Sequence, residues 1–354
     1  MKKNIRNRKI RTVAVLLLLM LSILAFDACT RRPLEEDYVE TALIPVRIDW
    51  SISGVPVEGM HRASVWLFPV NGETPLEYRL EGNLTYREIP VPVGVYSVLV
   101  FNETIEENDW DAITFTGTER YETFAAMAVP DASRGAYFRS EEQPFIKNPD
   151  ELAAWSLNRF EVTWAMVERT RTIARENSSY INLLENEVPD LTKVKPLPRF
   201  ERIIITAYVT NLSSAFQSTG FIDGMAAGVY LVSGEMVSVP AVHAFILNGR
   251  VYEENGQDGT TTRAFNILGR LSGTATQHQV TIDFLLMDGT LHPRQEFEVT
   301  YQMNFLAVEG IVKTYPINLG YDLSDGDHPI ELPDMDMGAG ISVGEWDEVI
   351  IPIM

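Results

Sequence analysis

Apolar residues alternate with polar ones in three short segments of the second half of the chain, and this pattern constrains the fold more than any other feature. The segments span residues 203–210, 280–286 and 296–303. Their apolar members are Ile203, Ile205, Ala207 and Val209, then Val280, Ile282, Phe284 and Leu286, then Phe297, Val299, Tyr301 and Met303. A period of two places these side chains on one face of a strand. The pattern predicts antiparallel strands with one face in a core and the other in water.

The first half of the chain, from residue 41 to about 127, also favours strands. Residues 42–50 alternate, with Pro45 tolerable at a sheet edge, and the apolar run 63–70 precedes Asn71-Gly72, a dipeptide typical of tight turns. Residues 95–101 are apolar on both faces, so this strand is either covered on both sides or lacks a partner.

Residues 149–198 break this pattern. Pro149-Asp150-Glu151-Leu152 is a plausible helix start, residues 162–164 fit a strand equally well, and prolines follow at 189, 196 and 198. We therefore expect a mainly β chain with two tandem antiparallel β-sandwich domains, at residues 41–148 and 199–354, joined by a partly helical linker at 149–198.

The N-terminus has the pattern of an export signal. Six basic residues precede the 14-residue apolar run 13–26, which is too short to span a bilayer comfortably. The segment Leu24-Ala25-Phe26-Asp27-Ala28-Cys29 resembles a bacterial lipobox, which predicts a signal peptide at residues 1–28 and a lipidated Cys29. An ordinary secretory signal and an uncleaved membrane anchor are the alternatives.

Cys29 is the chain's single cysteine, which excludes an intrachain disulfide framework and a thiolate metal cluster. Its expected role is membrane attachment through acyl chains, two or more of which give stable anchoring. Residues 29–40 then form a tether whose acidic residues fit either a surface-export signal or a solvated linker. We expect a lipid-anchored protein of the outer membrane and leave open which face it occupies.

The charge of the chain excludes some partners. The formal net charge is −20, and removing residues 1–28 takes away six basic residues and one acidic residue, which leaves −25. Such a surface repels phosphate backbones, so nucleic-acid binding is not expected.

Signals for catalysis are weak. There is no Gly-x-Ser-x-Gly, His-Glu-x-x-His or Gly-rich phosphate motif. The five histidines at positions 61, 243, 278, 292 and 328 lack ligand spacing, and the acidic turn at 322–327 does not match an EF-hand loop. We expect no enzyme activity, no metal and no small-molecule cofactor.

Several features together resemble the fimbrillin-like lipoproteins of Bacteroidota, which include anchor and shaft subunits of type V pili. They are the lipobox-like segment, the β pattern of both halves, the strand ASVWLF at 63–68, the segment PVGVY at 92–96 and the element ISVGEW at 341–346. The resemblance implies two transthyretin-like sandwiches, export as a lipoprotein, and fimbrial subunits as partners through strand exchange. An uncharacterised relative that builds no pilus fits the same residues.

In type V shaft subunits an arginine-directed protease removes the first strand, and a neighbour's strand fills the groove. The resemblance makes residues 42–50 that first strand, with Arg62 the better processing candidate and Arg47 the other. Both equally fit plain surface arginines. The C-terminal residues Val349, Ile350, Ile351 and Ile353 would form either a closing strand or a strand donated to a neighbour.

Three hypotheses follow. The first is a fimbrial anchor or structural subunit that assembles by β-strand addition. The second is a stand-alone surface lipoprotein that binds a glycan or host ligand, which predicts an exposed aromatic patch, with Trp50, Trp66 and Trp110 as candidates. The third, a hydrolase, requires two carboxylates within about 5 to 10 Å across a cleft.

Overall fold

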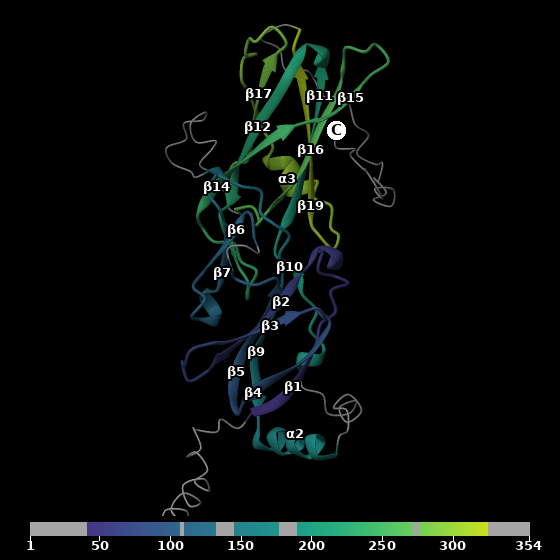
Figure 1. The fold of residues 1–354 in the computed structure, drawn as a ribbon. Coiled ribbons are helices and arrows are strands. Elements are labelled where there is room, and N and C mark those ends of the chain that lie inside the picture. Colours follow the sequence, from purple (N-terminus) through teal and green to yellow (C-terminus); the bar gives the residue numbers. More distant parts are fainter. Residues whose placement is uncertain (1–40, 107–109, 132–144, 177–189, 272–275, 325–354) are drawn as a thin grey trace, which may run out of the picture.

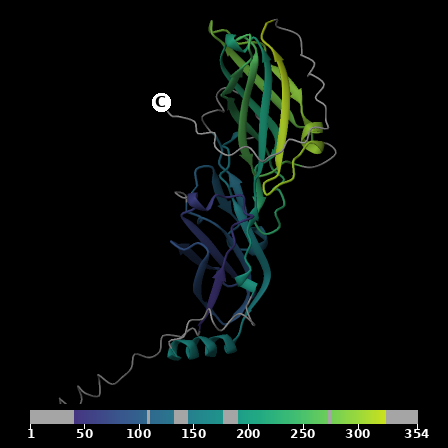
Figure 2. The ribbon, with the colours of Figure 1, turned by 90° about the vertical axis from the view of Figure 1, so that its right-hand side faces the viewer.

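The computed structural model describes residues 41–106, 110–131, 145–176, 190–271 and 276–324. They are mainly β-strands, arranged in two lobes stacked end to end (Figure 1, Figure 2). The predicted signal peptide 1–28, the tether 29–40 and the C-terminal residues 325–354 lie outside the described residues. No helix among the described residues is long and apolar enough to cross a membrane.

The first lobe consists of two antiparallel sheets. A two-stranded sheet pairs β1 (Thr41–Arg47) with β4 (Tyr86–Pro92). A five-stranded sheet has the order β10-β9-β5-β2-β3. Its strands are β10 (Leu197–Pro198), β9 (Ala153–Val162), β5 (Gly94–Asn102), β2 (Arg62–Pro69) and β3 (Leu76–Glu81). Ile44, Ile89, Val65 and Val98 belong to one core cluster, which places this core between the two sheets.

The second lobe also has two sheets, and its strand pairing is mixed. One sheet has the order β15-β16-β11-β19, and in it β11 and β19 run parallel. Its strands are β15 (Gly249–Tyr252), β16 (Gly259–Ile267), β11 (Glu201–Thr210) and β19 (Thr314–Asp322). The other has the order β18-β17-β12-β14-β8, with β14 and β8 parallel. Its strands are β18 (Gln295–Glu298), β17 (Gln279–Leu286), β12 (Ala215–Ala226), β14 (Pro240–Leu247) and β8 (Phe145–Ile146).

The alternation predicted at residues 203–210 and 280–284 is confirmed, because the second lobe's core contains all of the expected inward-facing residues: Ile203, Ile205, Ala207, Val209, Val280, Ile282 and Phe284. The third segment is only partly a strand. β18 ends at Glu298, and residues Thr300–Phe305 form helix α3. Val299 and Met303 are both fully buried, whereas Tyr301 is 55% exposed. The buried residues are thus four positions apart, as on one face of a helix, and not two apart, as the predicted strand requires.

The two lobes share a third core. A three-stranded sheet joins β6 (Ile113–Thr116) and β7 (Ala125–Ala128) to β13 (Gly228–Tyr230), whose sequence follows β12 of the second lobe. This core combines residues from both lobes: Trp66, Phe68, Leu99, Phe101, Phe124, Val229, Leu231, Ala241 and Leu268. Val98 faces the first core and Leu99 this one, so β5 is covered on both sides, one of the two arrangements that its sequence allowed.

Residues 149–198, expected to form a linker, contribute β9, helix α2 (Trp164–Glu176) and β10. β9 lies between β10 and β5 because its main chain pairs with β5 from Val162 to Ala154, a contact that local sequence does not reveal. The division into two domains at this segment stays a prediction. Short 3₁₀ turns complete the described chain, at Val57–Gly59, Tyr121–Thr123, Asp190–Thr192 and Leu212–Ser214.

Candidate functional site

The first strand, β1, lies at one side of the first lobe and contributes a full set of core side chains. Its seven residues pair with β4 from Thr41 opposite Pro92 to Arg47 opposite Tyr86. Ala42, Ile44 and Val46 are fully buried in the first core. Burial of an aliphatic side chain of this kind contributes about 1.5–3 kcal/mol. β1 is therefore a substantial part of the core although one strand holds it in a ladder.

The other edge of β1 is closed by groups that are not a strand. The main-chain N–H of Leu43 donates to Thr170 Oγ1 of α2 at 3.0 Å. Just beyond β1, the N–H of Asp49 donates to the carbonyl oxygen of Val194 at 2.8 Å. The carbonyl oxygen of Arg47 also accepts the N–H of Val194 at 3.3 Å, so three main-chain groups of this edge find partners on α2 and Val194, and among the described residues the edge carries no regular ladder.

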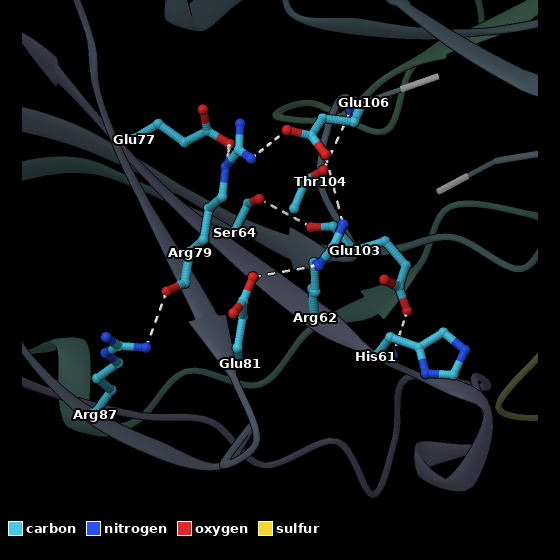
Figure 3. Close-up of polar contacts among 10 residues, drawn as sticks. All are labelled: His61, Arg62, Ser64, Glu77, Arg79, Glu81, Arg87, Glu103, Thr104 and Glu106. Carbon is cyan, nitrogen blue, oxygen red and sulfur yellow. Dashed lines mark hydrogen bonds and ion pairs between the residues drawn. The ribbon is translucent and has the colours of Figure 1, made fainter. Parts of the chain in front are cut away.

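Arg62, the predicted processing residue, is the first residue of β2 and lies in a network of charged side chains (Figure 3). Its guanidinium is 3.4 Å from a carboxylate oxygen of Glu81 and 3.5 Å from one of Glu106. Glu106 also pairs with Arg79, whose Nε lies 3.2 Å from Glu77 Oε1. The side chains are part-exposed, so each pair stabilises the lobe by about 0–1 kcal/mol.

The peptide bond after Arg62 is protected by the sheet. Ala63 is fully buried, and β2 lies between β3 and β5, where Ala63 is opposite Leu80 on one side and Asn102 on the other. The carbonyl oxygen of Arg62 also accepts the N–H of Glu103 at 2.9 Å. A protease needs an extended, accessible segment, and here that requires opening two ladders. Arg47, the other candidate, is exposed at the end of β1, with its guanidinium 5.9 Å from the ring centre of Tyr86.

Glu103 joins this network to the loop before β2, and sequence reasoning missed it. It is 8% exposed and has φ of +59°, a left-handed conformation that is uncommon for a residue other than glycine. Its Oε1 accepts the N–H of His61 at 2.6 Å, and its carbonyl oxygen accepts the hydroxyl of Ser64 at 2.9 Å. Glu103 thereby fixes both ends of the turn into β2. No local sequence signal marks this position.

A pocket of about 620 Å³ lies beside Glu103, where the two lobes meet. Its lining includes His61, Glu103, Trp110, Asp150, Glu151 and Asn266. Burial raises the pKa of Asp150 and, despite the opposing effect of Arg202, the pKa of Glu151. Asp150 Oδ2 accepts the N–H groups of Asp111 and Ala112, and Glu151 pairs with Arg202 at 2.9 Å. The pocket's carboxylates therefore hold loops and lobes together.

The three tryptophans that could have formed an exposed binding platform are buried. Trp50, Trp66 and Trp110 are 4%, 7% and 7% exposed. Trp50 Nε1 donates to the carbonyl oxygen of Leu84 at 2.9 Å, and Trp110 packs edge-on against Phe115 in the third core. These three residues form cores, so they do not provide the aromatic surface patch that a glycan-binding module requires.

The remaining candidates are dispersed or lie outside the described residues. The described ranges contain no group of three or more His, Cys, Asp or Glu side chains placed to hold a metal. His243 is fully buried in β14, whereas His61 is exposed. Three sets of candidates lie outside the described residues. They are the lipidation residue Cys29, the acidic-turn and histidine positions Asp325, Asp327 and His328, and the C-terminal strand residues Val349, Ile350, Ile351 and Ile353.

Solved structures share this fold. A Bacteroides ovatus protein described as a putative adhesin aligns with a TM-score of 0.51 at 18% identity, over 85% of this chain and 98% of its own. A Bacteroides thetaiotaomicron protein with the same description aligns with a TM-score of 0.47 at 7% identity, over 80% of this chain and 92% of its own. The fimbrial anchor protein Mfa2 of Porphyromonas gingivalis aligns with a TM-score of 0.43 at 10% identity, over 79% of this chain and 90% of its own. The resemblance to the fimbrillin-like proteins is confirmed at the level of the fold.

The mainly β fold is therefore that of the Bacteroides ovatus protein described as a putative adhesin. The chain belongs to the family described as Domain of unknown function (DUF5119), whose sequence model matches residues 28–245. No protein with a curated description matches the chain.

Proposed function

We propose that this chain is a non-enzymatic cell-surface lipoprotein, a fimbrial anchor or structural subunit that assembles by β-strand addition. Cys29 carries the lipid that holds it at the outer membrane, and the two lobes are the two transthyretin-like domains. The observation that carries the proposal is the position of β1, which fills a core groove but, within the described part of the chain, forms a ladder with β4 alone. The fold shared with a Bacteroides protein described as an adhesin supports a surface role.

The proposed partner is a strand of a neighbouring fimbrial subunit that takes the place of β1. Such a strand would form a ladder with β4 and place alternate apolar side chains in the positions of Ala42, Ile44 and Val46. The incoming strand forms the same kinds of main-chain bonds and apolar contacts that β1 gives up. The net free energy of the exchange is therefore small and depends on how well the incoming side chains fit the core. The apolar residues Val349, Ile350, Ile351 and Ile353 give this chain a strand to donate in turn.

The protection of the Arg62–Ala63 bond supports the anchor over the processed shaft subunit. An anchor keeps its lipidated N-terminus, and β1 then leaves the groove while residues 48–61 still connect it to β2. The stand-alone lipoprotein that binds a glycan or host ligand is the alternative, and it needs no exchange of β1.

The proposal is tested by locking β1 with a disulfide. Ile44 and Ile89 are opposite each other in the ladder of β1 and β4, so Ile44→Cys with Ile89→Cys joins the two strands. Val251→Cys with Thr260→Cys is the matched control, because it joins β15 and β16 of the second lobe. If acylated, Cys29 has no thiol left to compete with either pair.

Each variant is expressed in the native host and isolated from the outer membrane, with and without a reductant. We expect the locked β1 variant to lose the co-purifying fimbrial subunits and to regain them on reduction, while the control keeps them throughout. Retention of the subunits with β1 locked would contradict exchange at β1. Absence of subunits from every variant, the unlocked chain included, would favour the stand-alone lipoprotein.

A further inference from the structure

Helix α2 lies across the end of the first lobe that is farthest from the second lobe (Figure 1, Figure 2). Its inner face is fixed to the lobe by Val167, which is 2% exposed, and by Met166, which packs against the first core. Thr170 Oγ1 accepts the N–H of Leu43 and donates to the carbonyl oxygen of Met166 at 3.0 Å. The helix is therefore a fixed part of the lobe, attached to the strand at which the described chain begins.

The outer face of α2 carries an exposed tryptophan. Trp164, the first residue of the helix, is 58% exposed, unlike the three buried tryptophans described above. Ala165, Glu168 and Thr172 are also exposed. Tryptophan and tyrosine are enriched at the boundary between lipid and water, because their rings combine an apolar body with a polar group.

The charge near α2 differs from that of the whole chain. Residues 164–172 of α2 contain two basic residues, Arg169 and Arg171, and one acidic residue, whereas the whole chain has a net charge of −20. Arg171 pairs with Glu168 at 2.6 Å. Exposed pairs of this kind contribute little, so these cations can turn to phosphate groups at small cost.

The length of the tether limits how far this end can lie from the anchor. Eleven residues separate Cys29 from Thr41, which span at most about 40 Å when fully extended. Thr41 begins β1, two residues before the Leu43 contact with α2. A chain anchored at Cys29 therefore presents the α2 end of the first lobe to the bilayer and the turn between β17 and β18 away from it.

We propose that the outer face of α2 rests on the phosphate-bearing headgroup layer of the membrane that holds the lipid anchor. Trp164 enters the boundary between headgroups and acyl chains, and Arg169 and Arg171 of the same helix contact phosphates. The contact orients the two lobes away from the membrane. This inference rests on the lipidation of Cys29 in the proposed function and adds a second, non-covalent membrane contact to it.

The test uses the full acylated chain, in which an introduced cysteine is the only free thiol because the natural sequence has Cys29 alone. Ala165→Cys places a spin label beside Trp164, and Leu291→Cys places one in the turn between β17 and β18, where Leu291 is 72% exposed. Each protein is reconstituted in phosphatidylethanolamine–phosphatidylglycerol vesicles, with and without added lipid A. Collision rates of the label with oxygen and with a water-soluble nickel chelate are then compared.

We expect the oxygen-to-nickel collision ratio at position 165 to exceed that at position 291 several-fold. Trp164→Ala should remove most of this difference, and Thr172→Ala, at an exposed position of the same helix, should leave it unchanged. A difference seen only with lipid A would assign the phosphates to that lipid. Equal ratios at 165 and 291 in a protein whose Cys29 is acylated by mass spectrometry would overturn the membrane contact alone. An unacylated Cys29 would overturn both this inference and the proposed lipoprotein.

Discussion

The side-chain amide of Gln302 forms two hydrogen bonds with the main chain of Asn318, in the way that a neighbouring strand would. The N–H of Asn318 donates to Gln302 Oε1 at 2.8 Å, and Gln302 Nε2 donates to the carbonyl oxygen of Asn318 at 3.1 Å. Asn318 lies in β19, the edge strand of its sheet. One side chain of α3 thus covers part of an edge that another chain could otherwise extend.

Gln302→Ala should therefore lower stability and expose this edge. Loss of both bonds is expected to reduce the free energy of unfolding by about 1–2 kcal/mol. Gln279→Ala is the matched control, because Gln279 bonds Glu296 on an exposed surface and should change the free energy little. Urea unfolding measures the difference, and sedimentation velocity measures self-association. Equal effects of the two substitutions would show that Gln302 does not protect the edge.

His243 should make the protein less stable in acid. Its ring is fully buried against Phe265, neither nitrogen has a hydrogen-bond partner among the described residues, and burial lowers the pKa of His243 to about 3. The unfolded chain, with a histidine pKa of about 6.5, then binds a proton that the folded chain does not. His243 therefore leaves the free energy of unfolding unchanged above pH 6.5 and lowers it as the pH drops. At pH 5 the loss due to His243 is about 2 kcal/mol.

His243→Leu should remove this dependence and stabilise the protein at neutral pH by about 1–3 kcal/mol, because it removes an unpaired buried polar group. The measurement is the free energy of unfolding from pH 5 to pH 7.5. A slope for His243→Leu equal to that of the natural chain would contradict the assignment.

The ion pair between Glu151 and Arg202 should couple the two lobes. Arg202 Nη2 lies 2.9 Å from Glu151 Oε1, and Arg202 Nε also donates to Asn266. Both side chains are about one-third exposed, so a double-mutant cycle with alanine is expected to give about 0.5–1 kcal/mol, decreasing with added salt. The exposed pair of Arg159 and Glu161 is the control, with a coupling near zero. Equal coupling energies for the two pairs would mean that the ion pair of Glu151 and Arg202 does not stabilise the contact between the two lobes.

An arginine-specific protease should leave the Arg62–Ala63 bond intact in the folded protein. The buried Ala63 and the two ladders of β2 keep this bond from the extended conformation that a protease requires. N-terminal sequencing should detect a product that begins at Ala63 only after urea unfolding. Rapid formation of this product from the folded chain would instead support the processed shaft subunit.

The strands with clear alternation were predictable because burial on one face leaves a local signature. Residues 203–210 and 280–284 form strands with the expected inward faces, and the Asp288-Gly289 turn has the positive φ, +84° at Gly289, that its sequence favours. The dipeptide Asn248-Gly249 stands between apolar runs and predicts a two-residue hairpin turn, but the strands on either side of it are not paired with each other. It lies between β14 and β15, which belong to different sheets, because pairing of β15 with β16 decides the path of the chain there.

The candidate site was less predictable because its contacts are distant in sequence. The residues of β1 suggested a first strand, but their partners Thr170 and Val194 lie more than a hundred residues away. Glu103 and Gln302 act through main-chain groups of other segments, and neither belongs to a recognisable motif. Arg62 follows a segment, 54–61, that is loop-like in sequence and in the structure, but its sequence does not show that the next peptide bond lies at the start of a central strand.

The central claim, a lipid-anchored fimbrial subunit, is tested most directly by isolating the intact protein from native outer membrane and identifying its partners and N-terminus by mass spectrometry. The account predicts an acylated Cys29 and stoichiometric recovery of fimbrial subunits. Recovery of an acylated monomer without any fimbrial partner would contradict it.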